Sequence, residues 1–211
     1  MKKNSNSIIR NHFHKNIFLY FIIVIFLIVG ISAGAITTKV LNTSQKKEII
    51  IFMDSFFKIL NEESINSGIL LKHSIINNIK TVGLLWFLGL IIIGIPLVFI
   101  VVVLRGFIIG FTVGFLYVEL GFKGFLFAIL AILPQNLFLI PGMVIISVMS
   151  LSFSIRIIKN KFKRSLKFNF LSEIIRFSLS VILLFILMLL GSLVEAYITP
   201  VFMKLVLGYV A

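Results

Sequence analysis

Long apolar runs, separated by short polar stretches, make up most of this chain. A helix rises about 1.5 Å per residue, so about 20 apolar residues cross the roughly 30 Å hydrocarbon layer of a membrane. The pattern predicts an all-α, polytopic integral membrane protein with about five transmembrane helices, in a single membrane domain over 1–211. The predicted spans are 17–36, 82–104, 106–120, 125–155 and 174–198.

The first run, 17–36, follows several basic residues, as the apolar part of a signal peptide does. Gly34 and Ala35 supply small residues near a potential cleavage point. The run is longer than the roughly 7–15 apolar residues of a signal-peptide core. We therefore interpret it as an uncleaved membrane anchor.

The second run, 82–104, has two features that disturb a regular helix. Gly94 and Pro96 interrupt it, and a proline inside a helix removes a backbone hydrogen bond and favours a kink. Arg105 ends the run. We place the Arg105 side chain, like that of Glu119, near a membrane interface.

The fourth run, 125–155, is long for one simple span and contains Pro134 and Pro141. These prolines predict either a tilted, kinked helix or a re-entrant piece followed by a span. The pattern leaves open whether 106–155 forms two full spans or a re-entrant hairpin.

Residues 37–81 form the one sizeable polar segment. Its first part carries an apolar stripe at steps of three and four, typical of a helix with one apolar face. A second short helix, about 70–79, leads toward the next span. Either this helical hairpin lies on the membrane or against the bundle, or the stripe docks a protein partner. The stripe consists of Ile49, Phe52, Met53, Phe56, Phe57 and Leu60.

The composition excludes a water-soluble fold. Hydrophobic residues make up 60% of the chain and charged residues 13%, with a mean hydropathy of +1.17. Soluble proteins are nearer half apolar and a quarter charged. The chain has no cysteine, which excludes a disulfide scaffold, thiolate metal sites and cysteine nucleophiles.

The basic residues indicate orientation. The chain has 20 Lys+Arg against 7 Asp+Glu, a net charge of +13, and these cations lie mainly beside apolar runs. Lys and Arg near span ends stay cytoplasmic and contact anionic membrane lipids, so we expect no nucleic-acid binding. Basic clusters at the N-terminus and at 156–167 predict that both are cytoplasmic. The segment 37–81 and the C-terminus are then outside.

Gly106, Gly110 and Gly114 recur every four residues after Arg105 and share one helix face. Glycines in this arrangement let another helix backbone approach closely. We interpret them as a packing face, with the lining of a narrow conduit as the alternative.

Gln135 and Asn136 follow Pro134 within an apolar stretch, where unpaired polar groups are costly. These amides are suited to bond backbone carbonyls one turn earlier, where a proline leaves them free, or groups on a facing helix. The functional alternative is a polar site at a broken helix.

Glu195 lies deep in the last apolar run, ahead of Tyr197 and Pro200. A carboxylate within a membrane usually faces the bundle interior and a polar partner. Three interpretations stay open for it: an ion pair or hydrogen bond inside the bundle, a proton-coupled transport site, and a contact with another protein.

No constellation of catalytic residues stands out. His12 and His14 belong to the N-terminal tail and His73 to the polar segment, so no histidine lies in a predicted span. A Ser–His dyad, a zinc motif and a paired-aspartate protease are unsupported, and the acids form no metal-ligand cluster. We therefore expect no enzyme activity, no cofactor and no metal site.

Four short stretches stand out when taken together. They are NIKTVGLLW at 78–86, RGFIIGFTVGF at 105–115, LPQN at 133–136 with Pro141, and EAYITPVF at 195–202. In order, spacing and five-span layout, the chain resembles the stage II sporulation protein M family over essentially its whole length.

This resemblance implies a membrane component of endospore formation, located in the mother-cell or septal membrane. It implies partnership with a lytic transglycosylase and a peptidoglycan amidase/endopeptidase, which thin septal peptidoglycan during engulfment of the forespore. In that complex the chain is a scaffold that recruits and positions the hydrolases, and its partners do the chemistry.

The alternative is a transporter or permease subunit, in which Glu195, Gln135 and Asn136 line a pathway. The sequence leaves open whether the chain forms a homo-oligomer, and whether it binds a lipid or a solute.

The predicted orientation is testable because the chain has no native cysteine. Cysteine introduced at Ser7 or Ser165 should be shielded from an impermeant thiol reagent in intact cells. Cysteine at Ser64 should be labelled. Labelling at Ser165 but not at Ser64 would reverse the orientation.

Overall fold

The computed structural model describes residues 5–62, 66–163 and 169–210. These residues fold into helices joined by short connections, with no β-strand among them, so the all-α prediction is confirmed. The elements are α1 (Ser5–Val40), α2 (Thr43–Glu62), α3 (Ser67–Leu90), α4 (Gly94–Lys163), α5 (Phe170–Leu193), the π-helical turn η1 (Val194–Ile198) and α6 (Thr199–Val210).

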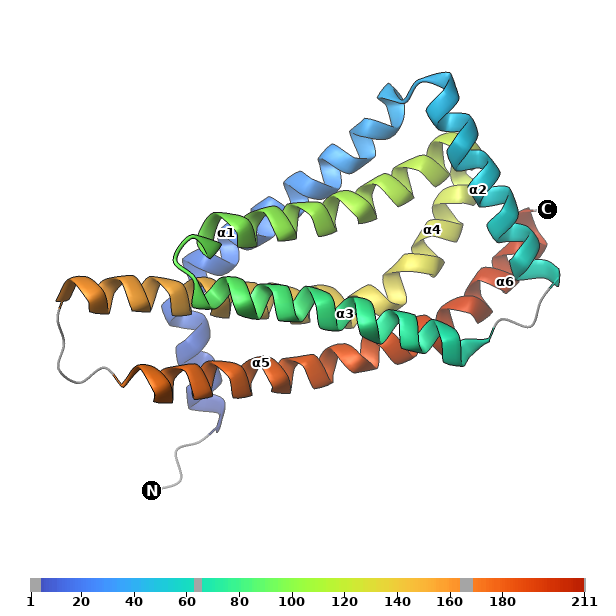
Figure 1. Cartoon of the computed structure of the whole chain (residues 1–211). Coiled ribbons are helices and arrows are strands. Elements are labelled where there is room, and N and C mark those ends of the chain that lie inside the picture. The colour runs from blue at the N-terminus through green and yellow to red at the C-terminus, as the bar shows by residue number, and fades with distance from the viewer. Residues whose placement is uncertain (1–4, 63–65, 164–168, 211) are drawn as a thin grey trace.

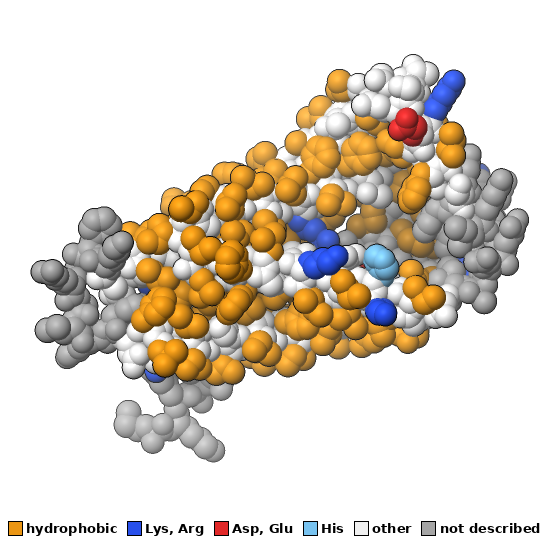
Figure 2. Space-filling view, viewed as in Figure 1, with side chains coloured by type: hydrophobic (Ala, Val, Ile, Leu, Met, Phe, Trp, Pro, Cys, Tyr) orange, Lys and Arg blue, Asp and Glu red, His pale blue; other side chains and the backbone are white. Residues whose placement is uncertain are grey.

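Three helical segments of the described chain are long and apolar enough to cross a membrane. They are Phe13–Val40, Gly94–Asn160 and Phe170–Leu205. Apolar side chains cover most of the face seen in Figure 2, as suits a protein surrounded by hydrocarbon.

The structure divides the predicted span 82–104 between two helices. α3 ends before Ile91, which is extended (φ −110°, ψ 133°), and α4 begins at Gly94. Gly94 lies so close to the Leu88 carbonyl that a side chain would clash with it. Pro96 thus stands in the first turn of α4, where its missing N–H costs no hydrogen bond, and not in a helix interior.

The polar segment 37–81 is also divided differently from the prediction. α2 is a separate helix, as expected, but the helix predicted at about 70–79 is the first part of the longer α3. The Asn66 side chain caps its start by accepting hydrogen bonds from the N–H groups of Gly68 and Ile69. α3 then continues along the bundle and buries Ser74 and Asn78 against other helices, while Lys72, His73 and Lys80 of the same stretch are exposed.

α4 reverses direction at Gly121, the one non-helical residue inside it (φ 60°, ψ −143°). Glycine adopts this positive φ without a steric penalty. The reversal gives α4 two arms, 94–120 and 122–163. Pro134 and Pro141 do not divide the second arm, which is helical through both prolines. Figure 1 shows it bending where yellow gives way to orange, which agrees with the kinked-helix interpretation.

Figure 1 shows how these elements are arranged. α1 runs beside the first arm of α4, and α3 and α5 run with the second arm. The first arm diverges from α3 toward the end where the two arms join. α2 crosses the end of the bundle where the arms join and where the C-terminus lies.

The glycine face of α4 packs against α1, which confirms the packing interpretation. A Cβ built on Gly106 would come within 3.1 Å of the Ile31 nitrogen, and one on Gly110 would collide with the Ile31 carbonyl oxygen. A Cβ on Gly114 would lie 3.0 Å from Ala35 Cα. α1 contributes its own pair of small residues, Gly30 and Gly34, which touch the backbone of the first arm. Sequence analysis missed this pair, although its spacing of four is the same signal.

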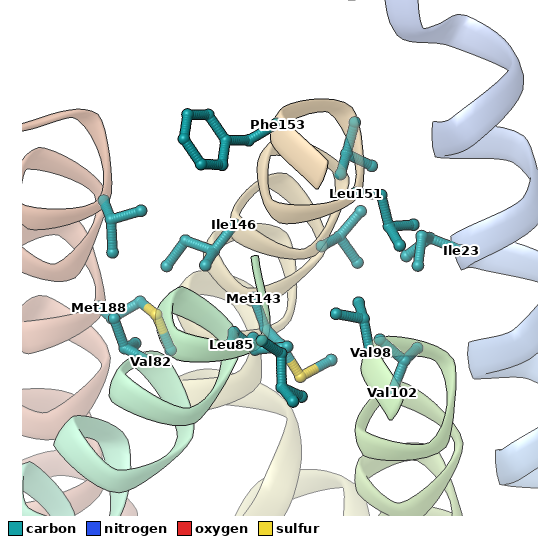
Figure 3. Packing of buried hydrophobic residues seen from close by; sticks show 14 of the residues in the cluster. Ile23, Val82, Leu85, Val98, Val102, Met143, Ile146, Leu151, Phe153 and Met188 are labelled. Carbon is teal, nitrogen blue, oxygen red and sulfur yellow. The ribbon is translucent and has the colours of Figure 1, made fainter. Parts of the chain in front are cut away.

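The main core lies where α3, α5 and both arms of α4 meet, with Ile23 of α1 at its edge (Figure 3). Small polar residues join the helices there. Ser150 on the second arm donates to the Leu85 carbonyl at 2.9 Å, and Ser154 donates to the Gly89 carbonyl at 2.6 Å. In a membrane, burying an apolar side chain against a helix gains little over leaving it in lipid. Hydrogen bonds between helices, such as these two, favour helix association because lipid tails cannot make them.

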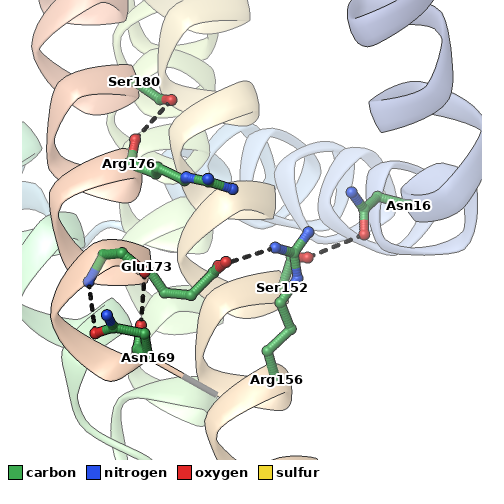
Figure 4. Close-up of polar contacts among 8 residues, drawn as sticks. Asn16, Ser152, Arg156, Asn169, Glu173, Arg176 and Ser180 are labelled. Carbon is green, nitrogen blue, oxygen red and sulfur yellow. Dashed lines mark hydrogen bonds and ion pairs between the residues drawn. The ribbon is translucent and has the colours of Figure 1, made fainter. Parts of the chain in front are cut away.

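The opposite end of the bundle from α2 is held by polar contacts between three helices (Figure 4). Ser152 of α4 donates to Asn16 Oδ1 of α1 at 3.1 Å. Arg156 of α4 pairs with Glu173 of α5 at 3.3 Å. The Arg156 side chain is largely exposed, so this ion pair contributes about 0–1 kcal/mol.

Gly110→Leu should destabilise the protein by about 1–3 kcal/mol or more, because the new side chain overpacks the contact with α1. Gly83→Leu on α3 is the matched control, since an added Cβ there meets nothing within 4 Å. The measurements are the amount of protein in the membrane and the thermal midpoint in detergent. Equal tolerance of both substitutions would contradict the assignment of Gly110 to a helix contact.

Candidate functional site

Four polar residues that are far apart in the sequence line one cavity of about 160 Å³. Arg105 comes from the first arm of α4, Gln135 and Asn136 from the second arm, and Glu195 from η1. Sequence analysis singled out each of them separately. The fold of α4 at Gly121 is what brings them together.

The two amides bond carbonyls of their own helix, and Gln135 also makes the predicted bond to a facing helix. Gln135 Nε2 donates to the Ala131 carbonyl at 2.7 Å, and Asn136 Nδ2 donates to the Ile132 carbonyl at 2.8 Å. Both carbonyls lie one turn earlier, so the amides support the helix beside Pro134. Gln135 Oε1 also accepts a hydrogen bond from Thr199 of α6 at 2.8 Å, which ties the two helices together.

Glu195 has a polar partner inside the bundle, as the first of its three interpretations expected. Its Oε2 accepts a hydrogen bond from Ser74 of α3 at 2.6 Å. Beside it, Asn78 Nδ2 donates to Ser192 Oγ at 2.9 Å. These bonds join α3 to α5 and η1, and Ser74, Asn78 and Ser192 are all buried.

A π-helical turn sets the position of Glu195. In η1 the Thr199 N–H bonds the Val194 carbonyl, five residues back. Pro200 follows at once and has no N–H to continue an α-helical ladder. The wider turn inserts one residue, and such single π-turns are frequent at functional sites.

Arg105 does not lie at the end of its helix, where the hydropathy pattern placed it. It lies within the first arm of α4 because that helix starts at Gly94, ahead of the boundary that the hydropathy pattern suggested. Among the described residues it makes no hydrogen bond and no ion pair, although it faces the same cavity as Glu195. Glu119 lies at the far end of this arm, where Lys46 of α2 approaches it at 3.9 Å.

The other candidates lie elsewhere. Gly106, Gly110 and Gly114 face α1. Pro141 and Tyr197 are exposed, and Pro200 is half-buried in the first turn of α6. None of these six residues lines the polar cavity.

A larger, apolar cavity of about 390 Å³ adjoins the polar one, and Thr112 and Ile132 line both. The predicted stripe of α2 contributes Ile49, Phe52 and Met53 to its wall. α2 therefore lies against the bundle, over the space between the arms of α4. The side chains of Phe56, Phe57 and Leu60 are outside the described part of the structure.

The polar cavity presents hydrogen-bond donors and acceptors together. Arg105 offers hydrogen-bond donors and a positive charge, while Asn136 and Glu195 offer acceptors. Within the described residues, no group of three or more His, Cys, Asp or Glu side chains lies close enough to hold a metal ion.

Residues 22–200 match the family model of stage II sporulation protein M. The chain belongs to the stage II sporulation protein M family. The matched range includes α3, both arms of α4 and every polar residue that lines the cavity, Thr112 among them. With its apolar helices, this membership makes the chain a sporulation membrane protein. A search of the curated proteins gives no match, and a search of the solved structures gives none.

Sequence analysis missed part of this site. Ser192 and Thr199 were not singled out, and Ser74 and Asn78 were assigned to a short helix at about 70–79, in a hairpin on the membrane or against the bundle. A signal was present, because Ser74 and Asn78 are four residues apart and share one helix face, as do Ser192 and Glu195 at a spacing of three. The true length of α3 was needed to place that face inside the bundle.

Thr199→Val should lower stability by about 0.6–1.7 kcal/mol, because it keeps the side-chain shape but leaves Gln135 Oε1 without its donor. Thr112→Val is the matched control, since the Thr112 hydroxyl bonds only the Ile108 carbonyl of its own helix. The measurement is the thermal midpoint of the purified protein in detergent. An equal shift for both variants would show that the contact between α4 and α6 adds nothing.

Proposed function

We propose that this protein is a membrane scaffold that recruits and positions peptidoglycan hydrolases at the septum during engulfment. Its partners in this proposal are an amidase/endopeptidase and a lytic transglycosylase, which carry out the chemistry, while the chain itself catalyses nothing. The observation that carries the proposal is the position of α2, which crosses one end of the bundle and leaves the Phe52 side chain largely exposed.

α2 is held against the bundle by few contacts. Met53 packs on the small cluster formed by Leu116, Phe127 and its neighbours. The Lys46–Glu119 pair is partly exposed and 3.9 Å long, so its contribution is about 0–1 kcal/mol. Phe52 lines the apolar cavity beside this cluster, yet its side chain is 74% exposed. An exposed aromatic beside an apolar cavity is the kind of anchor that dominates protein interfaces.

The two ends of the molecule support the proposed orientation. The start of α1, the end of α4 and the start of α5 lie at one end of the bundle, and α2 lies at the other (Figure 1). Basic clusters flank the first of these ends in the sequence, which favours a cytoplasmic location for it. α2 then faces the cell-wall side of the mother-cell or septal membrane, where peptidoglycan hydrolases act.

Phe52→Asp should leave the protein inserted but lower co-purification of the amidase/endopeptidase from sporulating cells by about tenfold or more, since an interface anchor contributes about 2 kcal/mol or more. Ile51→Asp is the matched control, because Ile51 is also exposed on α2 but does not line the apolar cavity.

Two outcomes would count against this proposal. An equal loss of co-purification with both variants would mean that any new charge on α2 disrupts binding, and that Phe52 does not form a specific docking surface. If Phe52→Asp still recruits its partner while Glu195→Gln abolishes function at normal abundance, a proton-coupled transporter becomes the better account, since its acid must cycle between charged and neutral forms.

A further inference from the structure

The polar cavity holds two opposite charges that do not meet. Arg105 and Glu195 both line it, and no ion pair joins them. Glu195 receives a hydrogen bond from Ser74, but a carboxylate has about four acceptor positions, so most of its capacity is unused. In apolar surroundings, an arginine and a glutamate on one cavity normally pair directly or through a group between them.

A further polar group in this cavity, the Asn136 amide, has an oxygen without a hydrogen-bond donor. Asn136 Oδ1 is buried and accepts no hydrogen bond, while its Nδ2 is used by the Ile132 carbonyl. A buried acceptor without a donor is costly, and such groups are rare in folded proteins. The cavity thus presents a donor with a positive charge on one side, and two acceptors, one of them negative, on the other.

The adjoining cavity has the opposite character. Its lining comes from α2, both arms of α4 and α6, and apart from Thr112 every lining residue is apolar. Phe52 and Thr112 are exposed, so this space opens to the surface of the molecule. Figure 2 shows basic side chains midway along the molecule, beside a hollow in an otherwise apolar face. A polar cavity of about 160 Å³ that shares Thr112 and Ile132 with an apolar one of about 390 Å³ matches a ligand with a small polar head and an apolar chain.

We propose that the paired cavities bind one phospholipid with a zwitterionic amine headgroup, of the phosphatidylethanolamine type. Its phosphate accepts hydrogen bonds from the Arg105 guanidinium, which suits phosphate oxygens. Its ammonium group donates to Glu195 and Asn136 Oδ1, and one acyl chain occupies the apolar cavity. An anionic lipid such as phosphatidylglycerol satisfies Arg105 equally well, but it offers no positive charge to Glu195.

This binding is independent of the proposed recruitment of hydrolases. The proposed lipid site lies between the helices, and the experiment measures lipid bound to the purified full-length chain, not a sporulation phenotype.

The test is native mass spectrometry of the purified protein with added phosphatidylethanolamine or phosphatidylglycerol. The wild-type protein should retain one phosphatidylethanolamine with an affinity about tenfold above that for phosphatidylglycerol, as a charge-assisted bond to Glu195 predicts. Arg105→Gln should lose both lipids. Glu195→Gln should bind the two lipids about equally, because it keeps the hydrogen bond to Ser74 but loses the charge.

Lys123→Gln is the matched control for loss of a positive charge, since Lys123 is exposed and lines neither cavity. Equal loss of lipid in Arg105→Gln and Lys123→Gln would overturn the proposal, because it would indicate general attraction to the surface. An unchanged lipid preference in Glu195→Gln would also overturn it. If Arg105→Gln does not fold, the preference measured with Glu195→Gln decides alone.

Discussion

The close contact between α1 and the first arm of α4 is the constraint on which the other helices depend. Lipid tails are as apolar as leucine, so apolar side chains alone do not hold two helices together in a membrane. Gly106 and Gly110 on one side, with Gly30 and Gly34 on the other, allow the backbones to touch. This contact fixes the direction of the first arm.

Once the first arm is fixed, the reversal at Gly121 determines where the second arm begins. That second arm supplies the serines that bond α3, and it carries Gln135, which bonds α6. The first arm follows α1 while the second follows α3 and α5. Residues of both arms line the polar cavity and the apolar cavity.

Buried polar groups decide how the remaining helices meet. Ser74 with Glu195, Asn78 with Ser192, and Gln135 with Thr199 each join two helices, and each satisfies groups that lipid cannot. Arg105 and Asn136 Oδ1 are exceptions to this rule within the described structure. Departures from local satisfaction are expected at functional sites, which is why these two groups carry the proposal of a bound lipid.

The sequence by itself determined the helical membrane character, the family and the packing role of the glycines, and it singled out Arg105, Gln135, Asn136 and Glu195 as polar residues in apolar surroundings. These follow from local properties, because hydropathy and spacing along one helix require no knowledge of its neighbours. Only the tertiary structure placed the turn between α3 and α4 before Arg105, since that depends on how closely Gly94 approaches Leu88. Only the tertiary structure, too, joined the four polar residues, because bonds such as Ser74–Glu195 link positions that are 121 residues apart. How close the polar residues of the two arms lie depends on the packing of α1 against α4 and on the reversal at Gly121. No local sequence pattern contains this information.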